Sequence, residues 1–199
     1  MTQSAGDDRG WRTRPGNIVA GIVLLARGRR AGLQHFAATG QGFLASLAPL
    51  IAFPLVTSLL ALAQGGGVAA VTDFLATVCA LLAPPVISHA LARAWGREAG
   101  WLRYATAFNW CQWAIPVIGT LAVLGMEALV AAGMPVQGAA ALAAMVLGGY
   151  ALWLHWFIAR HGLALSRARA VLLVLLVNLG SAALLLGPTL LAVALARRA

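Results

Sequence analysis

The chain has 199 residues, of which 61% are hydrophobic, and its mean hydropathy is +0.86. Soluble domains are roughly 45–50% apolar, and the few polar side chains of this sequence would not cover a core of this size, which excludes an ordinary soluble protein. The net charge of +9 comes from fourteen arginines without a lysine. Because these arginines flank apolar runs, we expect them at a membrane surface, where anionic lipids attract them, and not on nucleic acid.

Residues 1–42 are predicted to form a cytoplasmic segment ahead of the first membrane span. Within it, residues 17–30 have the pattern of a short amphipathic helix, in which an apolar stretch is followed by Arg27, Arg29 and Arg30. A helix this short does not cross a bilayer. We therefore expect it to lie in the interface, with the three arginines in contact with lipid phosphates. A loosely ordered basic tail is the alternative.

Five apolar stretches follow, and each is long enough for a membrane helix, which needs about 20 apolar residues. They cover residues 43–63, 68–92, 104–132, 136–159 and 170–196. Prolines inside four of these stretches predict kinks. The sequence therefore predicts an all-α fold, a polytopic transmembrane helix bundle of about five kinked spans with an N-terminal amphipathic interfacial helix. Residues 43–196 would form a single transmembrane domain.

The arginines also predict the orientation of the spans. All of them except Arg197 and Arg198 fall in the N-terminal segment or near the loops after the second and fourth spans. The positive-inside rule makes that side cytoplasmic, and the use of arginine, alanine and glycine without lysine indicates a bacterial inner membrane. Five spans then place the C-terminus in the periplasm, where the last two arginines break the rule. A re-entrant turn at residues 178–181 would instead return the tail to the cytoplasm.

Two acidic residues lie inside predicted spans, where ionisable groups are costly and are candidate functional residues. Asp73 and Glu127 lie a few residues from the outer ends of the second and third spans, at similar depth. Facing each other, they would share a proton or bind a cation. Alternatively, Asp73 caps a helix that starts near Thr72, and Glu127 reaches interfacial water.

Two histidines are also at matched depth, near the inner ends of the second and fourth spans. If His89 and His155 face each other, they could ligate a haem or line a quinone pocket. Interfacial histidines hydrogen-bonded to neighbouring residues are the alternative. The two cysteines show no zinc-ligand spacing, so we predict no metal site, and no motif calls for a cofactor.

The densest polar and aromatic cluster covers residues 109–113, at the inner end of the third span. Asn109 and Gln112 share one face of a helix, and Asn178 lies deeper in the fifth span. Hydrogen bonds between helices are the expected role of these amides. The sequence contains no HExxH, GxSxG or P-loop motif, so we predict no catalytic residue and no enzyme.

The start of the chain carries a family resemblance. The segments GLQHF (residues 32–36) and QGFL (residues 41–44), followed by Pro49 and Pro54, resemble small bacterial membrane proteins of the Yip-domain type (Ypt-interacting-protein-like). The resemblance covers the N-terminal segment and the first span by pattern, and the rest by span count. The Asp-Leu-Tyr-Gly-Pro motif of the eukaryotic members is absent. The resemblance implies a cytoplasmic N-terminus, five spans, an external C-terminus and a role in membrane organisation or partner binding.

From these observations we expect a non-enzymatic inner-membrane accessory or scaffold protein. It would act through helix packing and through cytoplasmic-face contacts with lipids, with other membrane protein subunits or with a second copy. Small residues spaced four apart at Ala140, Ala144 and Gly148 predict close helix packing. The tryptophans, which concentrate toward the predicted cytoplasmic side, indicate contacts on that face.

Two alternatives stay open. A small transporter or channel would use the intramembrane residues Asp73, Glu127 and Asn178, with the proline-containing spans as broken helices. The third hypothesis is a haem- or quinone-binding subunit that uses His89 and His155.

Overall fold

The computed structural model describes residues 17–197, without the side chains of residues 188–189 and 191–196. The first sixteen residues of the predicted N-terminal segment, and Arg198, therefore lie outside the described residues. Within the described range the chain is helical and contains no strand, which confirms the predicted all-α fold. The elements in order are α1 (Ile18–Ala26), the 3₁₀ helix η1 (Arg30–His35), α2 (Gly40–Ala63), α3 (Gly67–Ala94), the 3₁₀ helix η2 (Glu98–Gly100), α4 (Trp101–Cys111), α5 (Ala114–Ala131), α6 (Val136–Gly162) and α7 (Arg167–Ala196).

Five helical segments are long and apolar enough to cross a membrane. They are Gly40–Ala63, Gly67–Ala94, Glu98–Ala131, Val136–Gly162 and Arg167–Gly187. At most 22% of the most apolar window in any of them is buried inside the molecule. Lipid solvates so large an exposed apolar surface, whereas water does not. The chain is therefore a membrane protein with five apolar helices, as the sequence predicts.

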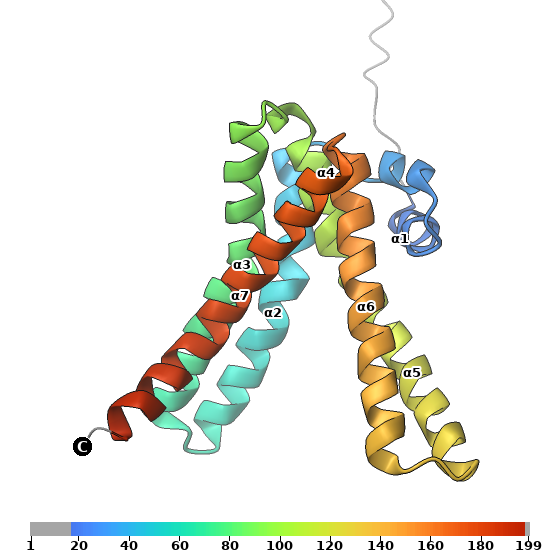
Figure 1. Cartoon of the computed structure of the whole chain (residues 1–199). Helices are drawn as coiled ribbons and strands as arrows, with labels where there is room; N and C mark the ends of the chain where they lie inside the picture. The colour runs from blue at the N-terminus through green and yellow to red at the C-terminus, as the bar shows by residue number, and fades with distance from the viewer. Residues whose placement is uncertain (1–16, 198–199) are drawn as a thin grey trace, which may run out of the picture.

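The spans form two arms that meet at one end of the molecule and diverge toward the other (Figure 1). The first arm contains α2, α3 and α7, and α3 packs along both of its neighbours. The second arm contains α5 and α6, which pack against each other. The arginines from Arg27 to Arg169 lie at or beside the end where the arms meet, which we call the arginine end.

A packed platform closes the arginine end. It consists of α1, η1, α4 and the adjoining ends of α3, α6 and α7, whose side chains form the main cluster of buried apolar residues. Leu25 of α1, Ala107 of α4 and Leu173 of α7 have no exposed surface. Farther along the arms, the buried side chains are mostly small, as at Ala70 and Ala139. The core of the protein is therefore at the arginine end and not along the middle of the spans.

The third predicted span is divided into two helices, α4 and α5, by a turn at Gln112 and Trp113. Pro116 gives the physical reason. Proline has no N–H to bond the carbonyl of Gln112, and its ring crowds that carbonyl. Because Pro116 lies in the first turn of α5, where proline is tolerated, it separates two helices instead of kinking one. Helices α2 and α3 continue through their prolines, and the kinks expected there stay a prediction.

The fifth span is one continuous helix, so the segment from Asn178 to Ser181 makes no re-entrant turn. Helix α7 runs away from the arginine end, and its C-terminal end lies at the opposite end of the molecule from α1 (Figure 1). Gly180 leaves room for a side chain of α3, because a Cβ atom there would lie 2.5 Å from Cδ1 of Ile87.

Candidate functional site

Helix α4 lies at the centre of the platform, where it contacts α1, α2, α3 and α6. More than half of its residues are buried. Polar side chains on α4 reach three different spans through hydrogen bonds. The pairs are Trp101 with Ser88 on α3, Tyr104 with His155 on α6, and Asn109 with Ser46 on α2. The short buried helix therefore links both arms through side-chain contacts.

The contact between Tyr104 and His155 is part of a chain of three polar side chains, which come from α4, α6 and α7. The hydroxyl of Tyr104 lies 3.0 Å from Nε2 of His155, and the amide nitrogen of Asn178 lies 3.3 Å from Nδ1 of the same ring. Tyr104 is 1% exposed and His155 is 5% exposed. The ring of Phe108 packs on the imidazole, with centroids 4.3 Å apart. His155 is thus held on several sides within the platform.

Asn178 sets the tautomer of His155. Its amide nitrogen also donates to the carbonyl oxygen of Val174, at 2.7 Å, so its two N–H groups serve Val174 and His155. Nδ1 of His155 is therefore an acceptor, and Nε2 carries the proton and donates to the oxygen of Tyr104. Both ring nitrogens are engaged, whereas the amide oxygen of Asn178 accepts no hydrogen bond from the described residues.

Asn109 connects α4 to α2. Its amide nitrogen donates to the hydroxyl of Ser46 at 3.0 Å, and this hydroxyl donates to the carbonyl oxygen of Phe43 at 2.6 Å. Asn109 and Ser46 are both buried. This bond between helices is of the kind that the sequence leads us to expect for an amide inside a span.

Two neighbouring cavities lie beside the C-terminal end of α4, and both are lined by Phe108, Gln112 and Asn178. The larger has a volume of about 290 Å³ and is bounded by α2, α3, α4 and α7, with Asn109 in its wall. The smaller has a volume of about 80 Å³ and is bounded by α4, α5, α6 and α7, with His155 in its wall. The three amide residues singled out in the sequence therefore come together, and His155 joins them.

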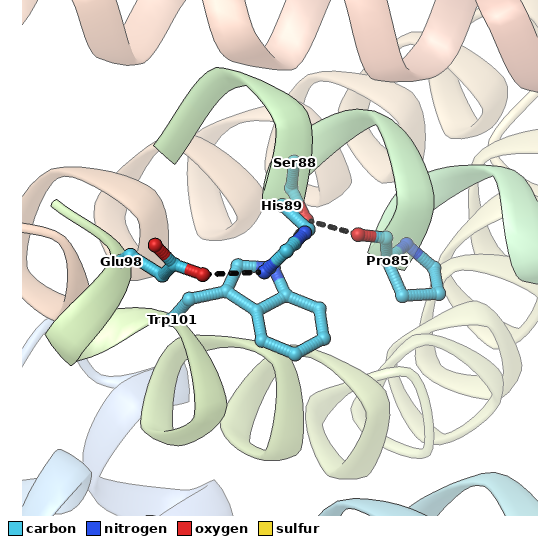
Figure 2. A network of polar contacts seen from close by, with 5 residues as sticks. All are labelled: Pro85, Ser88, His89, Glu98 and Trp101. Carbon is cyan, nitrogen blue, oxygen red and sulfur yellow. Dashed lines mark hydrogen bonds and ion pairs between the residues drawn. The ribbon is translucent and has the colours of Figure 1, made fainter. Parts of the chain in front are cut away.

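His89 belongs to a separate polar group at the arginine end (Figure 2). Its Nε2 lies 3.2 Å from Oε1 of Glu98, and its ring stands edge-on to Trp101, with centroids 4.6 Å apart. The indole N–H of Trp101 donates to the hydroxyl of Ser88 at 3.1 Å, and Ser88 donates to the carbonyl oxygen of Pro85 at 3.2 Å. The group fastens η2 and the start of α4 to the end of α3.

The structure does not bring His89 and His155 together. The side chain of His89 is 40% exposed and contacts Glu98, whereas His155 is buried against residues of other helices. Haem iron needs an unengaged ring nitrogen from each histidine, and both nitrogens of His155 already have partners. The arrangement does not fit haem ligation by this pair, nor a quinone pocket between the two rings.

Asp73 and Glu127 are also apart, because α3 and α5 belong to different arms (Figure 1). Both side chains are exposed. Asp73 does not cap a helix near Thr72, as the alternative proposed, because α3 begins at Gly67 and Asp73 lies inside it. The part of the chain that the structure describes contains no group of three or more side chains suited to a metal ion. Within one copy of the chain, the two carboxylates form no shared site.

Arg27, Arg29 and Arg30 are exposed where α1 ends and η1 begins. Helix α1 is shorter than the predicted helix over residues 17–30 and ends at Ala26. The carbonyl oxygen of Ala26 accepts a hydrogen bond from the hydroxyl of Tyr150 at 2.8 Å, which fastens α1 to α6. The position of α1 along a membrane surface, and contact of its arginines with lipid phosphates, stay predictions.

Sequence reasoning missed Tyr104, Ser46 and Ser88, which complete these networks. A serine inside a helix ordinarily bonds a carbonyl of its own helix, so its identity gives no sign of a second partner. Tyr104 offered a usable signal, because it is three residues after Trp101 and four before Phe108. That spacing places an aromatic stripe on one helix face.

In comparisons with protein-family models, with curated proteins and with solved structures, no match to this chain was found. The functional argument therefore depends on two features of the chain itself. One is the packed platform with its buried polar contacts, and the other is the pair of exposed apolar arms. Together they describe a membrane protein whose hydrogen-bonded polar candidate residues gather toward one end, whereas Asp73 and Glu127 lie on separate arms.

Proposed function

We propose that the chain is a non-enzymatic accessory or scaffold protein of the bacterial inner membrane, with its arginine end in the cytoplasm, that assembles with another membrane-spanning protein. The observation that carries this proposal is the contrast between a packed platform and two arms with exposed apolar faces. A protein that positions partners needs a rigid body and accessible helix faces, and it needs no catalytic group. The resemblance to Yip-domain proteins implies the same kind of role.

One face of α6 supports the proposal in particular. Ala140, Ala144 and Gly148 are all exposed, and a Cβ atom added at Gly148 would meet nothing within 4 Å. Leu142 and Val146 line the groove toward α5 instead, so the small residues lie on a face that the described residues leave open. Small residues let membrane helices approach closely. This face therefore suits a partner helix.

Native mass spectrometry of the protein extracted in native lipid nanodiscs tests the proposal. We expect an assembly of fixed stoichiometry with another membrane protein. The variant Ala144→Leu should lose the partner, because a large side chain separates the backbones on that face. The matched variant Ala131→Leu, at an exposed position of α5, should keep it. A monomeric wild-type chain, or equal loss in both variants, would count against the proposal, and a pure homo-oligomer would replace the heteromeric partner with a second copy.

A small transporter or channel is the second candidate, favoured by the division of the third span at Gln112 and Trp113. Broken helices line binding sites in many transporters. In this case the amides near the break, rather than Asp73 and Glu127, would line the path. Flux measurements in proteoliposomes separate the two sets: Gln112→Leu should stop transport, whereas Asp73→Asn and Glu127→Gln should leave it unchanged. Absence of any flux through the wild-type protein would remove this candidate.

A further inference from the structure

The two cavities beside α4 present hydrogen-bonding groups that lack partners within the described part of the chain. The hydroxyl oxygen of Ser181 on α7 is buried and has no hydrogen-bond partner there, and Ser181 lines the larger cavity. Asn178 is exposed, and its amide oxygen accepts no hydrogen bond from the described residues, because the amide nitrogen makes both of its contacts. A buried hydroxyl without a partner is costly. Ser181 and Asn178 line the same cavity, which points to an occupant that bonds both of them.

The lining excludes a charged occupant. No arginine, aspartate or glutamate lines either cavity. The polar lining consists of the neutral amides of Asn109, Gln112 and Asn178, the hydroxyl of Ser181 and the imidazole of His155. A charge moved into such a place without a counter-charge would carry a large desolvation cost. The remaining walls are apolar, and Phe108 contributes an aromatic surface to both cavities.

The unoccupied groups also define the polar chemistry of the occupant. The oxygen of Asn178 needs a donor, the hydroxyl of Ser181 supplies a donor, and the side-chain amide of Gln112 offers both functions. A neutral hydroxyl group donates and accepts at once, so it matches this set. Occupied together, the cavities of about 290 and 80 Å³ reach only the lower end of the roughly 300–1,000 Å³ usual for small-molecule sites. They therefore suit a head group and not a whole lipid.

The cavities lie where the apolar part of a bound molecule could extend between the two arms. The smaller cavity is bounded by α7 of the first arm and by α5 and α6 of the second, and the arms diverge from there (Figure 1). We propose that the cavities beside α4 bind the neutral hydroxyl head of a membrane-dissolved molecule whose apolar body extends between the arms. This site does not depend on the scaffold role, because it uses the inner wall of the arms and not the outer face of α6.

Photolabelling of the purified protein in nanodiscs tests the proposal. The probe is hexadecanol with a diazirine in its chain, and the labelled peptides are mapped by mass spectrometry. We expect saturable labelling near the end of α4 and around Asn178 on α7, displaced by unlabelled hexadecanol. Hexadecane and hexadecanoic acid should displace the probe roughly tenfold less well, since the first lacks a hydrogen-bonding head and the second carries a charge. Labelling spread along both arms, or equal displacement by hexadecane, would overturn the proposal.

Variants locate the site. Ser181→Ala and Gln112→Leu remove hydrogen-bonding groups, and each should weaken displacement by hexadecanol by roughly three- to tenfold. Ala80→Leu places a large side chain in the wall of the larger cavity and should abolish saturable labelling. Ser58→Ala is the matched control, because Ser58 lines a different groove, between α2 and α3, and it should behave as wild type. If all three cavity variants bind the probe as the wild type does, the proposed binding site is wrong. Where a variant fails to fold, displacement of the probe from the wild-type protein by hexadecanol, hexadecane and hexadecanoic acid still tests the proposal.

Discussion

The platform and the arms of this protein are built from similarly apolar sequence but are stabilised differently. In the platform, Tyr104 is 1% exposed and Leu154 is 2% exposed, whereas on the arms Leu121 is 62% exposed and Val68 is 83% exposed. In water, exposure of these apolar arm residues would be unfavourable. In lipid they cost little, because hydrocarbon tails solvate an apolar side chain about as well as a protein interior does. Packing contacts and hydrogen bonds, and not removal of apolar surface from water, therefore distinguish the two regions.

The polar contacts follow the same division. Among the described residues, the hydrogen bonds that join side chains of two different helices lie on α4 or one contact away from it. The two arms are thus held relative to each other at the arginine end, while each arm holds itself together by helix packing. Substitutions in the two regions should consequently have very different effects.

The largest contrast is expected for one leucine in each region. Leu154→Ala should lower the free energy of unfolding by about 2–4 kcal/mol, because the surrounding platform residues lose contacts around the new cavity. Leu121→Ala should change it by less than about 0.5 kcal/mol, because lipid fills the space. Unfolding of the purified protein in mixed micelles by SDS titration, followed by circular dichroism, measures both. Similar losses of unfolding free energy in the two variants would contradict the distinction between platform and arms.

The polar chain around His155 should give the next largest effect. His155→Leu leaves Tyr104 and Asn178 without a shared partner and should cost about 1–3 kcal/mol in the same titration. Tyr104→Phe should cost about 1 kcal/mol, and the double variant should lose less than the sum because the two residues are coupled. His89→Leu serves as the control, with a loss below about 0.5 kcal/mol, since half-exposed pairs contribute little. Additive losses at Tyr104 and His155 would contradict the hydrogen bond between them.

Packing inside the first arm should have a smaller effect. Gly180→Leu places a large side chain against Ile87 of α3, which must move to make room, and should cost about 1–2 kcal/mol. Ile87→Ala should restore part of that loss by making room. Gly187→Leu is the control, because a Cβ atom there meets nothing within 4 Å, and it should be neutral. Failure of Ile87→Ala to compensate would show that the two helices do not pack in this register.

The division of the third span should give the smallest change in stability. Pro116→Ala restores an N–H that can bond the carbonyl of Gln112 and should shift the free energy of unfolding by less than about 1 kcal/mol. The geometry should change more than the stability. Spin labels on α4 and α5, compared by pulsed electron resonance, should move apart as the two helices straighten into one. An unchanged distance would mean that tertiary packing, and not proline, causes the break.

The sequence predicts the helices better than it predicts the contacts between them. Predicted spans 43–63 and 68–92 correspond closely to α2 and α3, because apolar runs bounded by glycine or arginine can be located residue by residue. The break at Gln112 was missed, since Pro116 in an apolar run reads equally well as a kink. The candidate site was predicted only in part, because Asn109, Gln112 and Asn178 were singled out without Tyr104 or Ser181.

By itself the sequence determined five apolar helices, the clustering of arginines at one end and the depth of each polar residue along its span. These properties depend on composition and on distance along one helix, so they need no partner. Only the tertiary structure decided which residues meet. Asp73 and Glu127 were predicted at similar depth but lie on different arms, whereas His155 meets Tyr104 and Asn178 from two other helices. The physical reason is that such pairing depends on where helices cross and which faces they turn to each other, and hydrophobic periodicity does not encode the crossing of helices distant in the chain.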